Sequence, residues 1–246
     1  MDPRPFVYYF PILTTIVTLV FAAQIYRRYV QRGRMGNHLL WWTIGVLTYG
    51  MGTFTESYIT ILGWNPVIFK VWYIAGALLG GAPLAQGTVW LLLKPQTARR
   101  LTFALLTAVV ISAIFIIVSP VNTPVDLHLP SGRALGWQWA RYFSPFINTY
   151  AVVFLIGGAI LSAVRYRRVA TAGQGEVAEL AQDRFFGNVL IAIGAILPAI
   201  GGASSRAGHT QVLYILELVG IILIWLGYWL NVRKRPLDEQ PPGTTD

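Results

Sequence analysis

Long apolar stretches without charged residues recur along the whole chain. A bilayer core of about 30 Å requires about 20 mostly apolar residues for one helical crossing. The sixth stretch is the least regular, because Pro198, Gly201 and Gly202 interrupt its outer end. The predicted fold class is all-α, a polytopic membrane protein built as a seven-transmembrane-helix bundle within residues 1–235. The predicted spans are residues 6–26, 39–62, 71–93, 101–118, 143–164, 185–203 and 211–232.

The segments between these stretches are short, so the pattern predicts a single domain. Residues 236–246 are polar and rich in Pro and Gly, which is typical of a disordered tail. No cleavable secretion signal is expected, since the first span is longer than a signal core and is followed by Arg27 and Arg28. Residues 119–141 form the longest outer connection; their prolines predict a lid and their aromatic residues an interfacial anchor, and a simple connector is the alternative.

Composition supports the membrane assignment. Of the 246 residues, 55% are hydrophobic and 12% are charged, and the mean hydropathy is +0.56. A soluble domain carries about 25% charged residues, so this chain is not an ordinary soluble enzyme, a coiled coil or a disordered protein. The chain has no cysteine, which excludes disulfides, thiolate metal sites and a cysteine nucleophile.

Positive charge is distributed unevenly between alternate loops. One set of loops holds 14 of the 19 Lys and Arg residues and the other set holds five. By the positive-inside rule, the N-terminus lies outside and the C-terminus in the cytoplasm of a plasma or inner membrane. The net charge of +9 is expected to meet anionic lipid headgroups on the cytoplasmic side, and no nucleic-acid partner is expected. The richer set is Arg27, Arg28, Arg32, Arg34, Lys94, Arg99, Arg100, Arg165, Arg167, Arg168, Arg184, Arg233, Lys234 and Arg235.

Small residues and a proline share one face of the third predicted span. Gly76, Gly80, Pro83 and Gly87 are spaced four, three and four residues apart, which places them on one side of a helix. Gly76 and Gly80 form a GxxxG pair, a pattern that allows two helix backbones to approach closely. We therefore expect this face to pack against another helix, and we expect Pro83 to kink the span.

Only two acidic residues lie well within the predicted spans, Glu56 and Glu217. Their positions place both in the outer third of the bilayer, and ionisable groups there are costly and commonly functional. Polar residues share their helix faces or enter from the same side, which predicts an outward-facing cavity. A purely structural ion pair is the alternative. Candidate lining residues are Tyr49, Thr53, Tyr214 and Asn148, and candidate countercharges are Lys70, Arg141 and Arg206.

Other chemistries find little support. His38 is predicted at the inner interface, whereas His128 and His209 are predicted outside, so the three cannot share one metal. A retinal Schiff base requires a lysine within the last span, and residues 213–232 contain none. No catalytic residue, metal site or cofactor is assigned.

Two functions therefore stay open. The first is transport of a small solute or ion through an outward-facing polar cavity centred on Glu56 and Glu217. The second is a non-catalytic sensor or accessory subunit that binds another membrane protein or a second copy of itself. A polar counterpart in the inner half would favour transport, because alternating access needs both sides. Gln24, Gln86 and Asn188 are the candidates for it.

Overall fold

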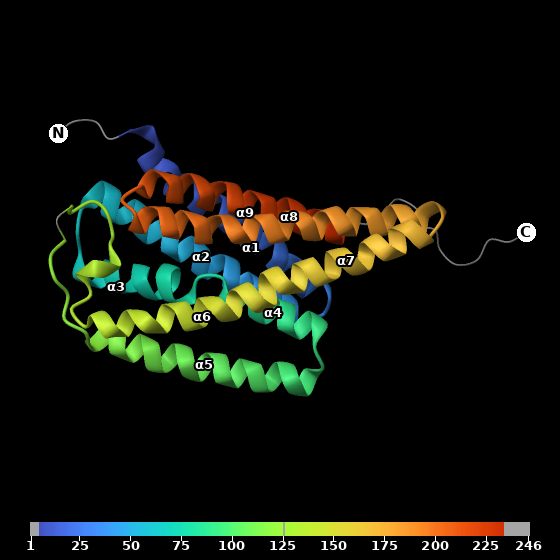
Figure 1. Cartoon of the computed structure of the whole chain (residues 1–246), viewed down its shortest axis with the longest axis horizontal. Helices are drawn as coiled ribbons and strands as arrows, with labels where there is room; N and C mark the ends of the chain where they lie inside the picture. The colour runs from blue at the N-terminus through green and yellow to red at the C-terminus, as the bar shows by residue number, and fades with distance from the viewer. Residues whose placement is uncertain (1–4, 125, 234–246) are drawn as a thin grey trace, which may run out of the picture.

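The structure is a computed structural model that describes residues 5–124 and 126–233. It is all-α, apart from one isolated bridge between Val121 and Leu135, and the helices lie side by side in an elongated bundle (Figure 1). The tail predicted at residues 236–246 lies outside the described residues. The elements are η1 (Phe6–Tyr9), α1 (Phe10–Gln31), α2 (Asn37–Leu62), α3 (Pro66–Trp72), η2 (Tyr73–Leu79), α4 (Ala82–Leu92), α5 (Pro95–Val118), η3 (Gly132–Ala134), η4 (Gln138–Tyr142), α6 (Phe143–Ala151), η5 (Val152–Ile156), α7 (Gly157–Ala172), α8 (Gly175–Arg206) and α9 (Thr210–Val232).

Six helical segments in the described chain are long and apolar enough to cross a membrane. By helix length and hydropathy the chain is therefore a multi-pass integral membrane protein. α2 lies outside this set although it has 26 residues, because threonines, glycines, tyrosines and Glu56 reduce its apolar character. The six segments are Phe6–Gln31, Pro66–Leu92, Pro95–Val118, Gln138–Ala172, Gly175–Arg206 and Thr210–Val232.

The most apolar segment lies at the edge of the bundle. The most apolar 18-residue stretch of α5 has a mean hydropathy of 2.8, the highest value of the six segments, and Figure 1 shows α5 at one side, next to α6. Its large side chains Phe103, Val110 and Ile114 are more than half exposed. An exposed apolar belt of this kind is suited to contact with lipid acyl chains.

α2 packs against α1, α3, η2 and α4. Glycines allow this close packing. A Cβ atom on Gly45 would lie 2.7 Å from the backbone nitrogen of Leu84, and one on Gly52 would lie 3.1 Å from the Cα of Gly76. Because lipid removes the hydrophobic drive between helices, van der Waals contact of this kind holds membrane bundles together.

A second glycine contact joins α8 to α9. Gly187, Gly194 and Gly201 recur every seven residues on α8, and they meet Gly227, Gly220 and Leu213, respectively. A Cβ atom on Gly194 would lie 2.6 Å from the carbonyl oxygen of Gly220. The two antiparallel helices therefore contact each other backbone to backbone over four turns, a feature that the sequence reading missed.

The third predicted span is not one continuous helix. Asn65 begins α3 by accepting hydrogen bonds from the backbone nitrogens of Val67 and Ile68, at 2.9 and 3.1 Å. The following π-helical turn, η2, ends at Gly80, whose φ of +45° is favourable only for glycine. The chain then restarts as α4, with Pro83 in its first turn. Pro83 thus begins a helix, and the predicted kink within a continuous span is wrong.

The predicted glycine face divides between two partners. Gly76 faces Gly52 of α2, and Gly87 faces the Trp42 indole of the same helix. Gly80 instead faces the Asn148 side chain of α6. The GxxxG pair therefore does not form one interface, because the π-helical turn and the break change the direction of the chain between its two glycines.

The two ends of the bundle differ. Residues 119–124 and 126–137 fold over one end, called the loop end, where Asn122 donates to the carbonyl of Ala134 at 2.7 Å and the His128 ring contacts the carbonyl of Thr60 at 3.1 Å. At the opposite end, called the arginine end, Arg233 forms a 2.5 Å ion pair with Asp183. Most of the arginines of the charge-rich loops belong to this second end.

The glycine contacts between α8 and α9 generate a stability prediction. Gly194→Ala should lower the free energy of unfolding by about 1–3 kcal/mol, because its methyl group meets backbone that cannot move aside. The measurement is the midpoint of thermal unfolding in detergent. Gly202→Ala on the same helix is the control, since nothing lies within 4 Å of its Cβ position. Equal midpoints for the two variants would contradict the backbone contact.

Candidate functional site

The structure brings Glu56 of α2 and Glu217 of α9 close together. Glu56 is 3% exposed and Glu217 is half-buried, and the two carboxyl groups lie near enough to act on each other electrostatically. The residues are 161 positions apart in sequence, so only the packing of α2 near α9 makes this contact. We call these two side chains the acid pair.

Few hydrogen-bond donors contact the carboxyl groups of the acid pair. The indole nitrogen Nε1 of Trp72 donates to Oε1 of Glu56 at 2.9 Å. The Oε2 atoms of Glu56 and Glu217 are buried and accept from no donor group in the described structure. Buried polar atoms are normally hydrogen-bonded, so unsatisfied ones at two adjacent carboxyls require a chemical explanation.

The predicted countercharges have other partners or positions. Lys70 donates to the carbonyl of Ile117 at the end of α5, at 2.5 Å. Arg141 donates to Oε1 of Gln138 at 2.8 Å, and Arg206 is exposed as the last residue of α8. Among the described residues, none of the three is paired with the acid pair, so a simple structural salt bridge does not account for the two glutamates.

Two tyrosines, Tyr49 and Tyr214, lie near the acid pair. The Tyr49 hydroxyl donates to the main-chain carbonyl of Glu217 at 2.9 Å. Tyr214 is fully buried, and its hydroxyl has no hydrogen-bond partner. Its ring lies edge-on to Tyr8 of η1, with 6.1 Å between centroids, and Gln211 donates to the Tyr8 hydroxyl at 3.2 Å. Aromatic and hydroxyl groups thus extend from the loop end toward the carboxyls.

The polar stripe of α2 faces the protein interior, but its hydroxyls are already engaged. Thr53 donates to the carbonyl of Gly50 at 3.2 Å and contacts the Thr15 hydroxyl at 3.0 Å. Ser57 donates to the carbonyl of Thr53 at 2.9 Å. Bonds to the preceding helical turn satisfy these side chains without water.

Asn148 belongs to a different feature. Its Nδ2 donates to the carbonyl of Ala77 at 3.0 Å and to that of Ser144 at 2.9 Å. It therefore satisfies a carbonyl next to the break at Gly80 and joins α6 to η2. Its role in the described structure is to support the interrupted helix.

The three inner candidates each connect helices. Gln86 is fully buried, where it accepts from the Tyr150 hydroxyl at 2.5 Å and donates to Thr102 at 2.7 Å. Gln24 accepts from the indole of Trp225 at 2.7 Å. The third candidate, Asn188, donates through Nδ2 to Oδ1 of Asn231 at 3.0 Å. Each of these polar groups has a side-chain partner on another helix, in contrast to the Oε2 atoms of the acid pair.

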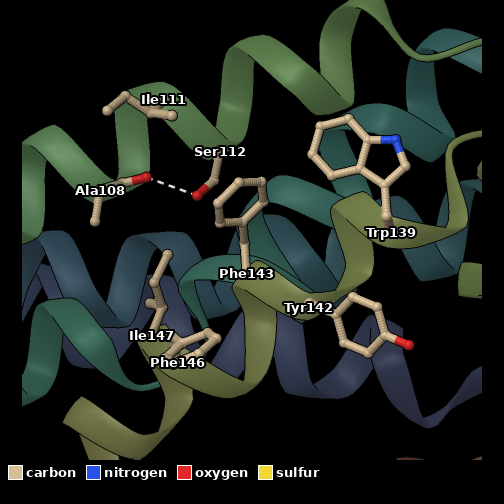
Figure 2. Close-up of a pocket in the computed structure, with 8 residues that line it drawn as sticks. All are labelled: Ala108, Ile111, Ser112, Trp139, Tyr142, Phe143, Phe146 and Ile147. Atoms are coloured by element: carbon tan, nitrogen blue, oxygen red, sulfur yellow. Dashed lines mark hydrogen bonds between the residues drawn. The ribbon is translucent and has the colours of Figure 1, made fainter.

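Two surface grooves lie away from the acid pair. One, of about 470 Å³, lies between α5 and the η4–α6 segment (Figure 2). It is apolar, and its serine hydroxyl donates to the carbonyl of Ala108 within its own helix at 2.6 Å. The other, of about 630 Å³, lies along α7 beside Arg167 and Arg168. The first groove is lined by Ala108, Ile111, Ser112, Trp139, Tyr142, Phe143, Phe146 and Ile147.

The described residues contain no group of three or more His, Cys, Asp or Glu side chains that could hold a metal ion. Comparisons with protein-family models, with curated proteins and with solved structures find no match for this chain. Function is therefore inferred from the chemistry of the acid pair and its neighbours.

Sequence reasoning missed Trp72 and Tyr8. Both are amphipathic aromatic residues near predicted span ends, where anchoring in the membrane interface is the usual explanation. In the structure Gly52 faces Gly76. These glycines lie one helical turn from Glu56 and from Trp72, respectively, so their crossing brings the two side chains together. That crossing could not be recognised until the structure placed α2 against η2.

The Trp72–Glu56 hydrogen bond can be tested by a double-mutant cycle. Trp72→Phe should lower the free energy of unfolding by about 1–3 kcal/mol, because a buried carboxyl loses its donor. The loss should be smaller in a Glu56→Gln background, and thermal unfolding in detergent measures both. Trp225→Phe, which removes an indole donor from the neutral Gln24, is the control. Equal losses with and without Glu56 would contradict a specific bond.

Proposed function

We propose that this multi-pass membrane protein transports a small solute or ion and that the acid pair binds the transported or coupling ion. One observation carries the proposal: two neighbouring carboxyl groups, each with a buried Oε2 atom that no donor reaches, have no Lys or Arg partner among the described residues. Such an arrangement is costly inside a membrane. Binding of a positively charged ion would repay that cost.

The proposed membrane arrangement has seven spans, with α2 as the seventh. At 1.5 Å per residue, the 26 residues of α2 extend about 39 Å, enough to cross a bilayer. The described conformation encloses the acid pair, so an outward-facing cavity would form when the segments at the loop end move apart. The loop end is assigned to the outside and the arginine end to the cytoplasm.

The interrupted third segment is consistent with transport. In many transporters, helices broken near the binding site provide the movement and the backbone groups that an ion needs. Here the π-helical turn η2 follows directly after Trp72. A change at η2 would therefore move the donor that contacts Glu56.

A second candidate is a sensor or accessory subunit that binds an ion from outside without transporting it. The satisfied contacts of Gln24, Gln86 and Asn188 favour this candidate, because they connect helices instead of lining a path. In this case the acid pair would change the packing of the bundle, and a membrane-protein partner or a second copy would respond.

The orientation can be measured with reporter fusions after residue 246 and within residues 122–132. A reporter active only in the cytoplasm should work at the C-terminus and fail in the 122–132 loop. This result follows from the excess of arginine at one end. The opposite pattern would overturn the assignment of the arginine end to the cytoplasm.

Transport can be measured with purified protein in lipid vesicles that contain dyes for protons, sodium and potassium. Glu56→Gln and Glu217→Gln should each reduce ion flux at least tenfold, because each removes an ionisable carboxyl from the site. Glu176→Gln changes an exposed glutamate of α8 and should leave the flux unchanged. Ion binding by a folded protein that shows no flux of any of these ions would contradict transport and support the sensor.

A further inference from the structure

We propose that the acid pair binds a single proton, shared between the carboxyl groups of Glu56 and Glu217, and exchanges it with the loop end. The inference deepens the proposed function, on which it rests for the use of that proton in transport. Binding forms one O–H bond on one carboxylate and changes the charge of the pair from −2 to −1. Release breaks the same bond and restores both charges.

The unsatisfied oxygens of the pair favour a hydrogen between the two side chains. An ionised carboxylate only accepts hydrogen bonds, whereas a protonated carboxyl also donates one. The Oε2 atoms of Glu56 and Glu217 are both buried without a donor in the described structure, and a proton on one carboxyl would supply a donor that the other can accept. Two adjacent carboxyls that share one proton are a known solution where like charges cannot both be tolerated.

The groups around the pair are neutral. Trp72 faces it from α3, Tyr49 and Thr53 lie on α2, and Tyr214 lies on α9. In the described part of the chain, the charged group that acts on each glutamate is the other glutamate. A proton is then the simplest positive charge that can offset the second carboxylate.

The donors at the site favour a proton over a metal cation. The Trp72 N–H is directed at Oε1 of Glu56, and the Tyr49 O–H at the carbonyl of Glu217. Hard metal cations require several free oxygen ligands, whereas here two of the oxygens already receive hydrogens. The buried Oε2 atoms can instead be satisfied by one shared proton.

A route to the loop end is visible in the contacts of α9 and η1. The hydroxyl of Tyr214 is buried beside the pair without a partner, and its ring contacts Tyr8. Tyr8 accepts a hydrogen bond from the exposed Gln211. Because a phenol both donates and accepts, Tyr214 is suited to relay the proton between the pair and the loop end.

Infrared spectroscopy of the full chain in lipid films tests the bound proton without any transport assay. At neutral pH the wild type should show a protonated-carboxyl C=O band that shifts in deuterium oxide. Glu56→Gln and Glu217→Gln should each alter or remove this band, and Glu176→Gln should retain it. If one of these two glutamate variants does not fold, the other variant alone tests whether the band belongs to the acid pair. A wild type without the band, or a band unchanged in both variants, would overturn the proposal.

The proposed proton relay through Tyr214 is tested by the rate at which the carboxyl band shifts in deuterium oxide. Tyr214→Phe should slow the deuterium shift of the band at least tenfold and leave the band itself in place. Tyr228→Phe is the matched control, since Tyr228 also has a buried hydroxyl without a partner but lies nearer the arginine end. Equal exchange rates in the two variants would overturn the route through Tyr214.

These experiments separate the two proposals. A protonated band in a protein that shows no ion flux would retain the shared proton and overturn transport. Sodium or potassium flux in a protein that lacks the band would overturn the shared proton and retain transport.

Discussion

Close backbone contact at glycines holds this bundle together, and the acid pair depends on it. In a bilayer the helices gain nothing from leaving lipid unless they pack more tightly than lipid does. At the crossing of Gly52 with Gly76 the added atom of any side chain would lie against backbone. This crossing places α3 and η2 so close to α2 that the Trp72 indole reaches Glu56.

The two halves of the bundle treat polar groups differently. Toward the arginine end, Gln86, Gln24 and Asn188 are paired with neutral partners and stabilise contacts between helices. Toward the loop end, Glu56 and Glu217 have one indole donor, and each retains a buried oxygen without a donor. Satisfied networks give a bundle a unique structure, whereas an unsatisfied pair is suited to bind and release an ion.

Several features were predictable because they depend on local sequence. The apolar stretches predicted where the helices lie, and the structure finds a helix at each of the seven positions. The membrane-spanning character of six segments follows from their hydropathy. Gly80, Gly81 and Pro83 indicate a local disturbance of the helix, but the complete break was not predictable, because Asn148, which supports it, is 68 positions away from Gly80.

The sequence by itself determined that the chain is helical, belongs to a membrane and carries Glu56 and Glu217 within apolar stretches. It could do so because helix length, hydropathy and the rarity of charge are properties of neighbouring residues. Only the tertiary structure decided that the two glutamates are neighbours, that Trp72 donates to Glu56 and that Lys70 and Arg141 have other partners. These contacts join distant segments, and the packing of small residues at helix crossings determines which segments meet.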